Sequence, residues 1–277
     1  MITPRSWASP PTFGRMETTL NGMHAVVCGS TQGIGKATAL ELARSGARVT
    51  LLARDSDKLG AVLKELDQSK GQAHGMMAAD MADTAALKLA IEACIAAHGP
   101  VNILVNNTGG PPPGLAHEAE LSAFENAFRL HLLAYQTLVR AIVPGMKASR
   151  HGRIINVIST SVKVPLANLG VSNTIRGAVA QWSKTLANEL GPFNITVNNV
   201  LPGATSTERL TGIIKNKSAK SGLSEEAATQ EMLDEIPLRR FAAPEEIAAA
   251  ICFLAGPSAA YINGINLPVD GGRTGCL

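Results

Sequence analysis

The sequence predicts a single α/β domain with a doubly wound, mainly parallel sheet of seven strands. Short β-rich runs alternate with longer runs at helical spacing from residue 20 onward, which is the pattern of βαβ units. Aromatic residues make up only 4% of the chain. Small aliphatic side chains must therefore fill the core, as they do between helices and a parallel sheet. No linker or repeat follows residue 20, so one domain with right-handed crossovers is expected.

The expected elements follow this alternation in order. Strands are predicted at residues 24–29, 48–54, 73–80, 101–107, 152–160, 194–203 and 263–272. Helices are predicted at residues 35–46, 57–71, 84–99, 118–146 and 178–190, with two more that begin at Glu225, after a Ser224 cap, and at Pro244. Residues 208–235 are expected to form a helical flap beyond the carboxyl ends of the strands, where ligands bind in such sheets.

The composition excludes several classes of protein. The net charge of +3 is too small to imply a nucleic acid or an anionic membrane as a partner. The four cysteines are scattered without paired spacing, so neither a metal site nor a disulfide framework is expected. No apolar run is long enough to span a membrane, and residues 1–19 lack a signal-peptide pattern. We expect residues 1–19 to be a flexible extension, residues 20–277 to form the domain, and the location to be cytoplasmic.

A glycine-rich loop, "GSTQGIG" at residues 29–35, lies between the first predicted strand and the first helix. Glycines let the backbone approach a pyrophosphate closely, and the N-terminus of the following helix attracts its charge. The glycine spacing, with Ala37 after Lys36, does not fit a nucleoside triphosphatase loop. Dinucleotide binding is therefore expected, and a purely structural turn is the alternative. The candidate contacts are Gly29, Ser30, Thr31, Gln32, Gly33, Ile34 and Gly35.

Further motifs follow the loop in order: Asp80, "NNTG" at residues 106–109, and Pro202-Gly203, accompanied by "GRIINVIS", "TLANELG" and "VDGG". Together they resemble the short-chain dehydrogenase/reductase family over about residues 20–272, and most of all its 3-oxoacyl-(acyl carrier protein) reductase-like branch. The resemblance implies a Rossmann-like domain and an oxidoreductase that acts on a small carbonyl or alcohol substrate. It also implies a homo-oligomer, a tetramer or a dimer, that pairs helices within residues 118–146 and 178–190.

The resemblance also implies which residues contact a nicotinamide dinucleotide. They are Asp80 and Met81 for the adenine, Asn107, Thr108 and Gly109 for its ribose, Arg176 for the nicotinamide ribose, and Pro202, Gly203, Thr205 and Thr207 toward the nicotinamide. Two of these positions have a structural alternative, because Asn107 could instead stabilise the central strands and Thr207 could instead cap a helix.

The choice between NADP and NAD depends on the end of the second strand. An acid there would bind both ribose hydroxyls of NAD, whereas Arg54 suits the 2′-phosphate of NADP. Gln32 stands where many NADP-dependent relatives carry a basic residue. NADP(H) is therefore favoured, NAD(H) remains possible, and a solvated surface role is the alternative for Arg54.

The resemblance predicts four reacting positions, of which only Ser159 keeps the family's residue, a serine that orients the substrate oxygen. Ser172 stands in place of the tyrosine that supplies the proton, and Arg176 in place of the lysine that lowers its pKa. His131 stands in place of an asparagine that holds a water in a proton relay. A serine hydroxyl is a far weaker acid than a phenol, and a guanidinium does not release a proton at ordinary pH. The family's tyrosine mechanism therefore does not carry over.

Two functions stay open. One is an oxidoreductase with non-standard proton delivery, in which Ser159, Ser172, Arg176 and His131 are catalytic. The other is a non-catalytic dinucleotide-binding sensor or partner subunit, in which Ser172 and Arg176 contact only ribose and phosphate or are structural. His131 either passes protons through water or is a buried helix residue. The flap also carries three lysines that either attract an acidic substrate or form a solvated face: Lys215, Lys217 and Lys220.

Overall fold

The sheet has seven strands in the order β3-β2-β1-β4-β5-β6-β7 in a computed structural model that describes residues 19–276. The strands are β1 (His24–Cys28), β2 (Arg48–Ala53), β3 (Gly75–Ala78), β4 (Ile103–Asn106), β5 (Gly152–Val157), β6 (Ile195–Pro202) and β7 (Asn266–Val269). The predicted doubly wound α/β fold is confirmed, and every strand pair is parallel. An extension is predicted at residues 1–19, and its first 18 residues lie outside the described part of the chain.

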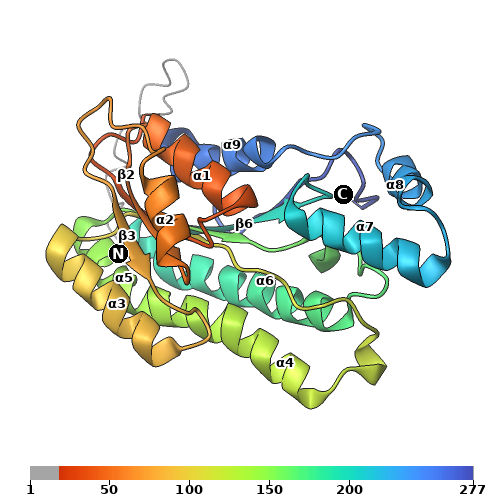
Figure 1. Ribbon diagram of the computed structural model, residues 1–277. Coiled ribbons are helices and arrows are strands. Elements are labelled where there is room, and N and C mark those ends of the chain that lie inside the picture. Colours follow the sequence, from red (N-terminus) through yellow and green to blue (C-terminus); the bar gives the residue numbers. More distant parts are fainter. Residues whose placement is uncertain (1–18, 277) are drawn as a thin grey trace, which may run out of the picture.

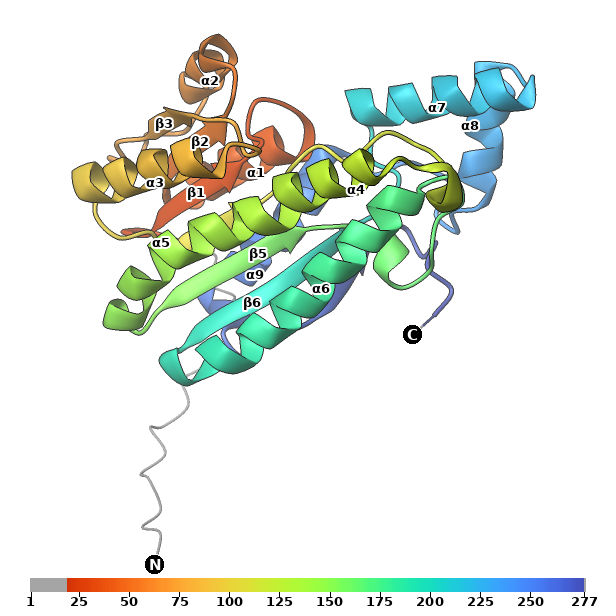
Figure 2. The ribbon, with the colours of Figure 1, turned by 90° about the horizontal axis from the view of Figure 1, so that it is seen from below.

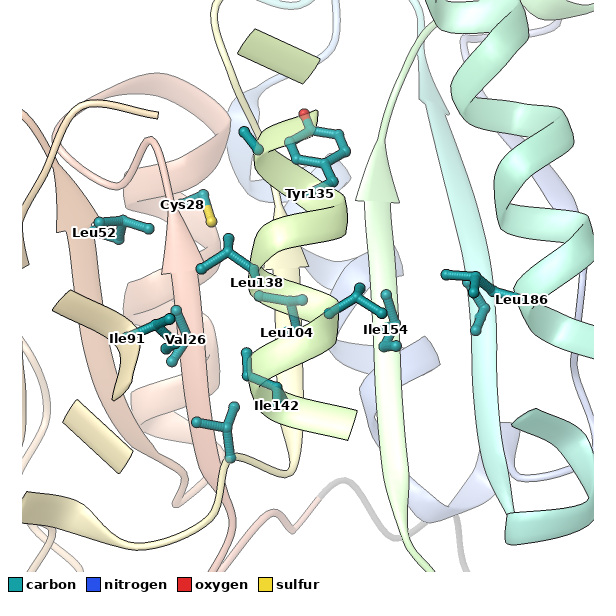
Figure 3. Packing of buried hydrophobic residues seen from close by; sticks show 14 of the residues in the cluster. Val26, Cys28, Leu52, Ile91, Leu104, Tyr135, Leu138, Ile142, Ile154 and Leu186 are labelled. Atoms are coloured by element: carbon teal, nitrogen blue, oxygen red, sulfur yellow. The ribbon is translucent and has the colours of Figure 1, made fainter. Parts of the chain in front are cut away.

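Helices cover both faces of the sheet (Figure 1). One face carries α1 (Gly33–Arg44), α2 (Ser56–Leu63) and α9 (Pro244–Ala255), and the other carries α3 (Thr84–His98), α5 (Ala134–Ser149) and α6 (Gly170–Leu190). Each face encloses an apolar core of small aliphatic residues, as the composition predicts. In one of them, Leu138 and Ile142 of α5 pack over Leu104 and Ile154 of the sheet (Figure 3).

Three helix boundaries differ from the predicted ones. α6 begins at Gly170 instead of residue 178, although residues 170–177 contain glycines, β-branched residues and short polar residues that favour a helix only weakly. Gly170 packs closely against Ala116, because a Cβ on Gly170 would lie 2.4 Å from the backbone nitrogen of Ala116. The helix predicted at residues 118–146 is divided into α4 (Leu121–Phe128), a π-helical turn η2 (Arg129–Leu133) and α5. α2 ends at Leu63 instead of Gly71, and a turn follows in which the Asp67 carboxylate accepts a backbone hydrogen bond of 2.8 Å.

Asparagine side chains form a ladder across four neighbouring strands. Asn106, Asn156, Asn199 and Asn266 occupy paired positions on β4, β5, β6 and β7. Each of the first three donates from Nδ2 to Oδ1 of the next, at 2.8, 3.0 and 2.7 Å. Because buried amides need partners, this ladder fixes the register of the strands.

Residues 208–235 contain two helices, α7 (Glu208–Ser221) and α8 (Glu225–Asp234), beyond the carboxyl ends of the strands (Figure 2). The Ser224 side chain accepts from the backbone of Ala227 at 3.2 Å, so the predicted cap is confirmed. α9 begins at Pro244, as predicted. Between residues 19 and 276, no helix combines the length and apolarity needed to cross a membrane.

Candidate active site

A pocket of about 620 Å³ lies at the carboxyl ends of the central strands, next to the flap. Residues that follow β4, β5 and β6 line it together with residues from α1, α6 and α7. The predicted site residues that it brings together are Ile34, Asn107, Thr108, Ser159, Ser172, Arg176, Pro202, Gly203, Thr205 and Thr207. The sheet reverses its winding between β1 and β4, and ligands bind at such reversals in open α/β sheets.

The three glycines of the loop between β1 and α1 have no room for a side chain. Gly29 and Gly33 have φ angles of +60° and +54°, which favour glycine. A Cβ at Gly35 would lie 2.1 Å from the carbonyl oxygen of Gly29. Asn107 Nδ2 donates to the carbonyls of Cys28 and Gly29 at 3.3 and 3.4 Å. Asn107 therefore stabilises the central strands, one of the two roles expected for it, while it also lines the pocket.

Several predicted cofactor contacts lie outside the pocket lining. The buried Ser30 hydroxyl accepts from the β2 backbone at 3.0 Å. Met81 packs into the apolar core. Asp80 is exposed, and its carboxylate accepts from the backbone of the following turn at 2.9 Å. Arg54 is exposed directly after β2. Thr31, Gln32 and Gly109 are exposed or half-buried. The three glycines of the loop, Gly29, Gly33 and Gly35, also lie outside the lining.

Thr207 packs over the glycine loop. Its methyl group would lie 3.1 Å from a Cβ on Gly33. It occupies the N-cap position of α7, but its side chain makes no cap hydrogen bond. Its Oγ1 donates instead to the carbonyl of Thr205 at 3.2 Å. The helix-cap alternative is therefore not observed, and Thr207 stands where the loop and α7 meet.

Ser159, Ser172 and Arg176 line one wall of the pocket. Ser159 Oγ accepts from the backbone of Ser161 at 3.1 Å. Ser172 and Arg176 lie on the first two turns of α6 and are each 6% exposed. The Arg176 guanidinium donates to the Val157 carbonyl at 2.8 Å and to a second backbone carbonyl at 3.4 Å. Burial lowers the pKa of this guanidinium, although it remains charged.

His131 lies behind the pocket wall, fully buried on the π-helical turn η2. Its Nδ1 is 2.6 Å from Thr108 Oγ1, which is in turn 2.8 Å from Tyr135 Oη. Thr108 lines the pocket, so its hydroxyl connects the cavity to both rings. Burial, followed by the charges of Arg176 and Arg209, lowers the pKa of His131 to about 2. His131 is therefore neutral near pH 7, and its Nε2 has no partner among residues 19–276.

Nothing in the sequence singles out Arg209, on the first turn of α7, as a pocket residue. Its Nη1 donates to the carbonyl of Gly110 at 2.9 Å, so it links the flap to the loop after β4. A Cβ at Gly110 would lie 2.5 Å from Nη2 of Arg209, so glycine at this position makes the link possible. The two residues are far apart in the chain, and only the fold shows that they meet.

The described part of the chain contains no group of three or more His, Cys, Asp or Glu side chains that could hold a metal ion. A family model described as enoyl-(acyl carrier protein) reductase matches residues 29–274. The chain belongs to the short-chain dehydrogenase/reductase family. The match begins at the first residue of the glycine loop and includes the whole pocket lining.

Relatives in this family match over nearly their full length. The NADPH-dependent reductase BacG of Bacillus subtilis is 30% identical over 249 residues, which are 90% of this chain and 96% of BacG. The 3-oxoacyl-[acyl-carrier-protein] reductase of Synechocystis is 33% identical over 92% of this chain and 98% of its own. L-sorbose reductase from Gluconobacter frateurii, solved with NADPH and L-sorbose, has a TM-score of 0.88 and 33% identity, covering 95% of this chain and 100% of its own.

Proposed function

We propose that this chain is an NADP(H)-dependent oxidoreductase that interconverts a carbonyl compound and an alcohol. One observation carries the proposal: Ile34 of the glycine-loop helix lines the same cavity as Ser159 and Ser172. Residues suited to a dinucleotide and residues suited to a carbonyl oxygen therefore face one pocket. The relatives BacG, named as NADPH-dependent, and L-sorbose reductase, solved with NADPH, support this reading.

The residues present fit NADP(H). At Gly35 the loop packs backbone against backbone, since a Cβ there would lie 2.1 Å from the carbonyl oxygen of Gly29. A glycine loop of this kind lets its backbone approach a pyrophosphate closely. The first turn of α1 has no acidic residue to oppose a phosphate at the helix N-terminus. Arg54, exposed after β2, offers its guanidinium to a 2′-phosphate. When bound, the cofactor would exchange a hydride with the substrate carbon, and the protein would orient the substrate and move the proton.

Proton delivery in this pocket differs from the family's tyrosine mechanism. We assign orientation of the carbonyl oxygen to Ser159 and Ser172, and stabilisation of negative charge on that oxygen to Arg176. The proton passes through the Thr108 hydroxyl, which lines the pocket and contacts His131. A neutral imidazole accepts on one nitrogen while it donates from the other. His131 Nε2 has no protein partner among residues 19–276, so a water molecule must supply a proton there. His131 then gives a proton from Nδ1 to the Thr108 hydroxyl and is neutral again after each transfer.

Thr108→Val tests this route, because valine keeps the shape of threonine and removes the hydroxyl. We expect kcat to fall by about 100-fold, the lower range for loss of general acid–base catalysis. The Kd of NADPH, measured by fluorescence titration, should stay near the wild-type value. Thr108→Ser restores the hydroxyl and should restore most of the activity. A Thr108→Val protein with wild-type kcat would exclude the route.

Fluorescence titration with NADPH and with NADH, followed by a screen of small ketones, tests the function itself. We expect tighter binding of NADPH and oxidation of NADPH by at least one ketone. Arg54→Gln should weaken NADPH binding by roughly ten-fold, the effect of losing one charge-assisted hydrogen bond, and should leave NADH binding unchanged. Equal losses for both cofactors would contradict the role of Arg54.

A second function, a non-catalytic dinucleotide-binding sensor or partner subunit, is favoured by two observations. The Arg176 guanidinium donates to backbone carbonyls, and no tyrosine of residues 19–276 lines the pocket. Tight NADPH binding without turnover of any ketone or alcohol would favour this function.

The homo-oligomer expected through residues 118–146 and 178–190 stays a prediction. Two exposed apolar side chains on α4 are compatible with such a contact, since Leu121 is 77% and Phe128 is 40% exposed.

A further inference from the structure

The side of α7 that lines the pocket carries Arg209 and apolar residues in its first half and two lysines in its second half. The residues on this face are Arg209, Leu210, Ile213, Asn216, Lys217, Lys220 and Ser221. The spacing of three and four residues places them on one side of the helix. The apolar part lies nearer the glycine loop, because Thr207, directly before α7, packs on Gly33. Lys220 is about 20 Å further along the axis, at 1.5 Å per residue.

The charges that line this pocket do not balance. Lys217 is paired with Glu231 at 2.9 Å, and Arg273 is paired with Glu235. Glu235 is the one acidic residue in the pocket lining of the described chain. Three further cations line the pocket, and none of them forms an ion pair within residues 19–276: Arg176, Arg209 and Lys220. The pocket is therefore strongly cationic until an anion enters it.

Lys220 carries the unpaired charge that lies away from the glycine loop. Its Nζ is 3.4 Å from Oδ1 of Asn168, which directly precedes the cap residue of α6. The N-terminus of this 21-residue helix has no acidic residue in its first turn and has a positive partial charge. The Lys220 ammonium group therefore lies close to the N-terminus of α6, and the first turn of this helix has no acidic residue that would neutralise it. An anion bound beside them would be attracted by both.

We propose that the substrate is a small oxo acid or hydroxy acid whose carboxylate is bound by Lys220. This inference rests on the proposed oxidoreductase function and names its substrate class. Ser172, on the first turn of α6, and Lys220 line the same pocket, so we expect one small molecule bound there to contact both. The phosphates of a dinucleotide belong at the glycine loop, near the opposite end of α7. They do not account for Lys220.

The structure separates the three flap lysines that the sequence leaves equivalent. Lys215 and Lys220 are both exposed, but Lys215 does not line the pocket. Lys217 lines it but already has Glu231 as a partner. Lys220 lines it and has an amide oxygen as its partner. Lys215 therefore serves as a control of the same residue type on the same helix.

The test compares the 3-oxo, 4-oxo and 5-oxo straight-chain acids with their methyl esters, because this series varies the spacing between the carbonyl and the carboxylate. We expect kcat/KM for the best acid to exceed that of its ester by at least about ten-fold, mainly through KM. Lys220→Gln should raise KM for the acid by roughly five-fold, leaving the ester and the Kd of NADPH unchanged. Lys215→Gln should behave as wild type.

Two further variants separate binding of the carboxylate from a structural role of Lys220. Lys220→Arg keeps the charge and should keep the preference for the acid. Asn168→Gly removes the Lys220 partner at a residue whose φ of +59° suits glycine, and it should also keep the preference. Equal use of acid and ester by the wild type would overturn the inference. Equal effects of Lys220→Gln and Lys215→Gln would overturn it too.

If the proposed oxidoreductase function is wrong, the experiment gives a different result from the one expected when only the carboxylate site is wrong. If NADPH binds but no acid or ester is turned over, the same compounds are titrated into the NADPH-bound protein and followed by nucleotide fluorescence. Binding of an acid that exceeds binding of its ester, by a margin that Lys220→Gln removes, would support the anion site without the reaction. Equal binding of acid and ester, or binding of neither, would overturn the inference.

Discussion

Gly35→Ala is expected to abolish measurable NADPH binding and to lower the free energy of unfolding by about 1–3 kcal/mol, the usual cost of overpacking. The added Cβ would lie 2.1 Å from the carbonyl oxygen of Gly29 and 2.8 Å from Nδ2 of Asn107. A backbone carbonyl cannot rotate away alone, so the loop must move. Its close approach to a pyrophosphate is then lost. Fluorescence titration with NADPH and unfolding in urea measure the two effects.

Gly60→Ala is the matched control, because it makes the same change inside another helix, α2. A Cβ at Gly60 meets no atom within 4 Å. This variant should gain about 0.5–1 kcal/mol of stability, since alanine favours the helix and restricts the unfolded chain. NADPH binding should be unchanged. Wild-type NADPH binding by Gly35→Ala would show that the cofactor does not bind at this loop.

The free energy of unfolding is expected to fall steeply as the pH decreases below about 6.5, the pKa of histidine in an unfolded chain. Burial, and secondarily the charges of Arg176 and Arg209, lowers the pKa of His131 to about 2. Burial, and secondarily the charge of Arg48, lowers the pKa of His24 to about 4. Both histidines are neutral in the folded protein at pH 7, so folding at this pH releases almost no protons from them.

The sign of the effect follows from proton binding. Above about pH 6.5 each histidine is neutral in both states and contributes no pH dependence. Below that value the unfolded chain binds protons that the folded chain does not, so acid favours unfolding. Each histidine removes about 1.4 kcal/mol per pH unit. This loss continues to about pH 4 for His24 and to about pH 2 for His131.

Urea unfolding at a series of pH values between about 7 and 4.5 measures this slope. His131→Asn should reduce the slope by about 1.4 kcal/mol per pH unit, even if it lowers stability at neutral pH. His117→Gln, which removes an exposed histidine, is measured beside it as the control substitution. A slope that does not change in His131→Asn would mean that the pKa of His131 is the same in the folded and the unfolded protein.

The fold and the floor of the pocket could be predicted because short segments determine them. The glycines of residues 29–35 are needed where backbone meets backbone, and the strand runs predict a parallel sheet from their residues alone. Asn107 and Pro202 follow directly from motifs at the strand ends. The start of α6 could not be predicted, because residues 170–177 favour a helix only weakly and become helical through tertiary packing.

The contacts that give the pocket its chemistry join segments that are distant in the chain. Arg209 reaches Gly110, and Lys220 reaches Asn168. No local pattern signals either contact. The sequence marks His131 as a departure from the family, but it does not show that Thr108 stands between this ring and the cavity. Burial also keeps His131 neutral, and the sequence does not show how deeply this residue is buried.

The asparagine ladder has a mechanical consequence for ligand choice. It crosses β4, β5 and β6 shortly before Asn107, Ser159 and Pro202, so the base of the pocket is stiff. The roof consists of α7 and α8, which are joined to the sheet through loops and have few buried residues. Ligands of different size must therefore be accommodated by displacement of the roof. New substrate ranges could arise by substitutions within residues 208–235 while the rigid base keeps the reacting groups in place.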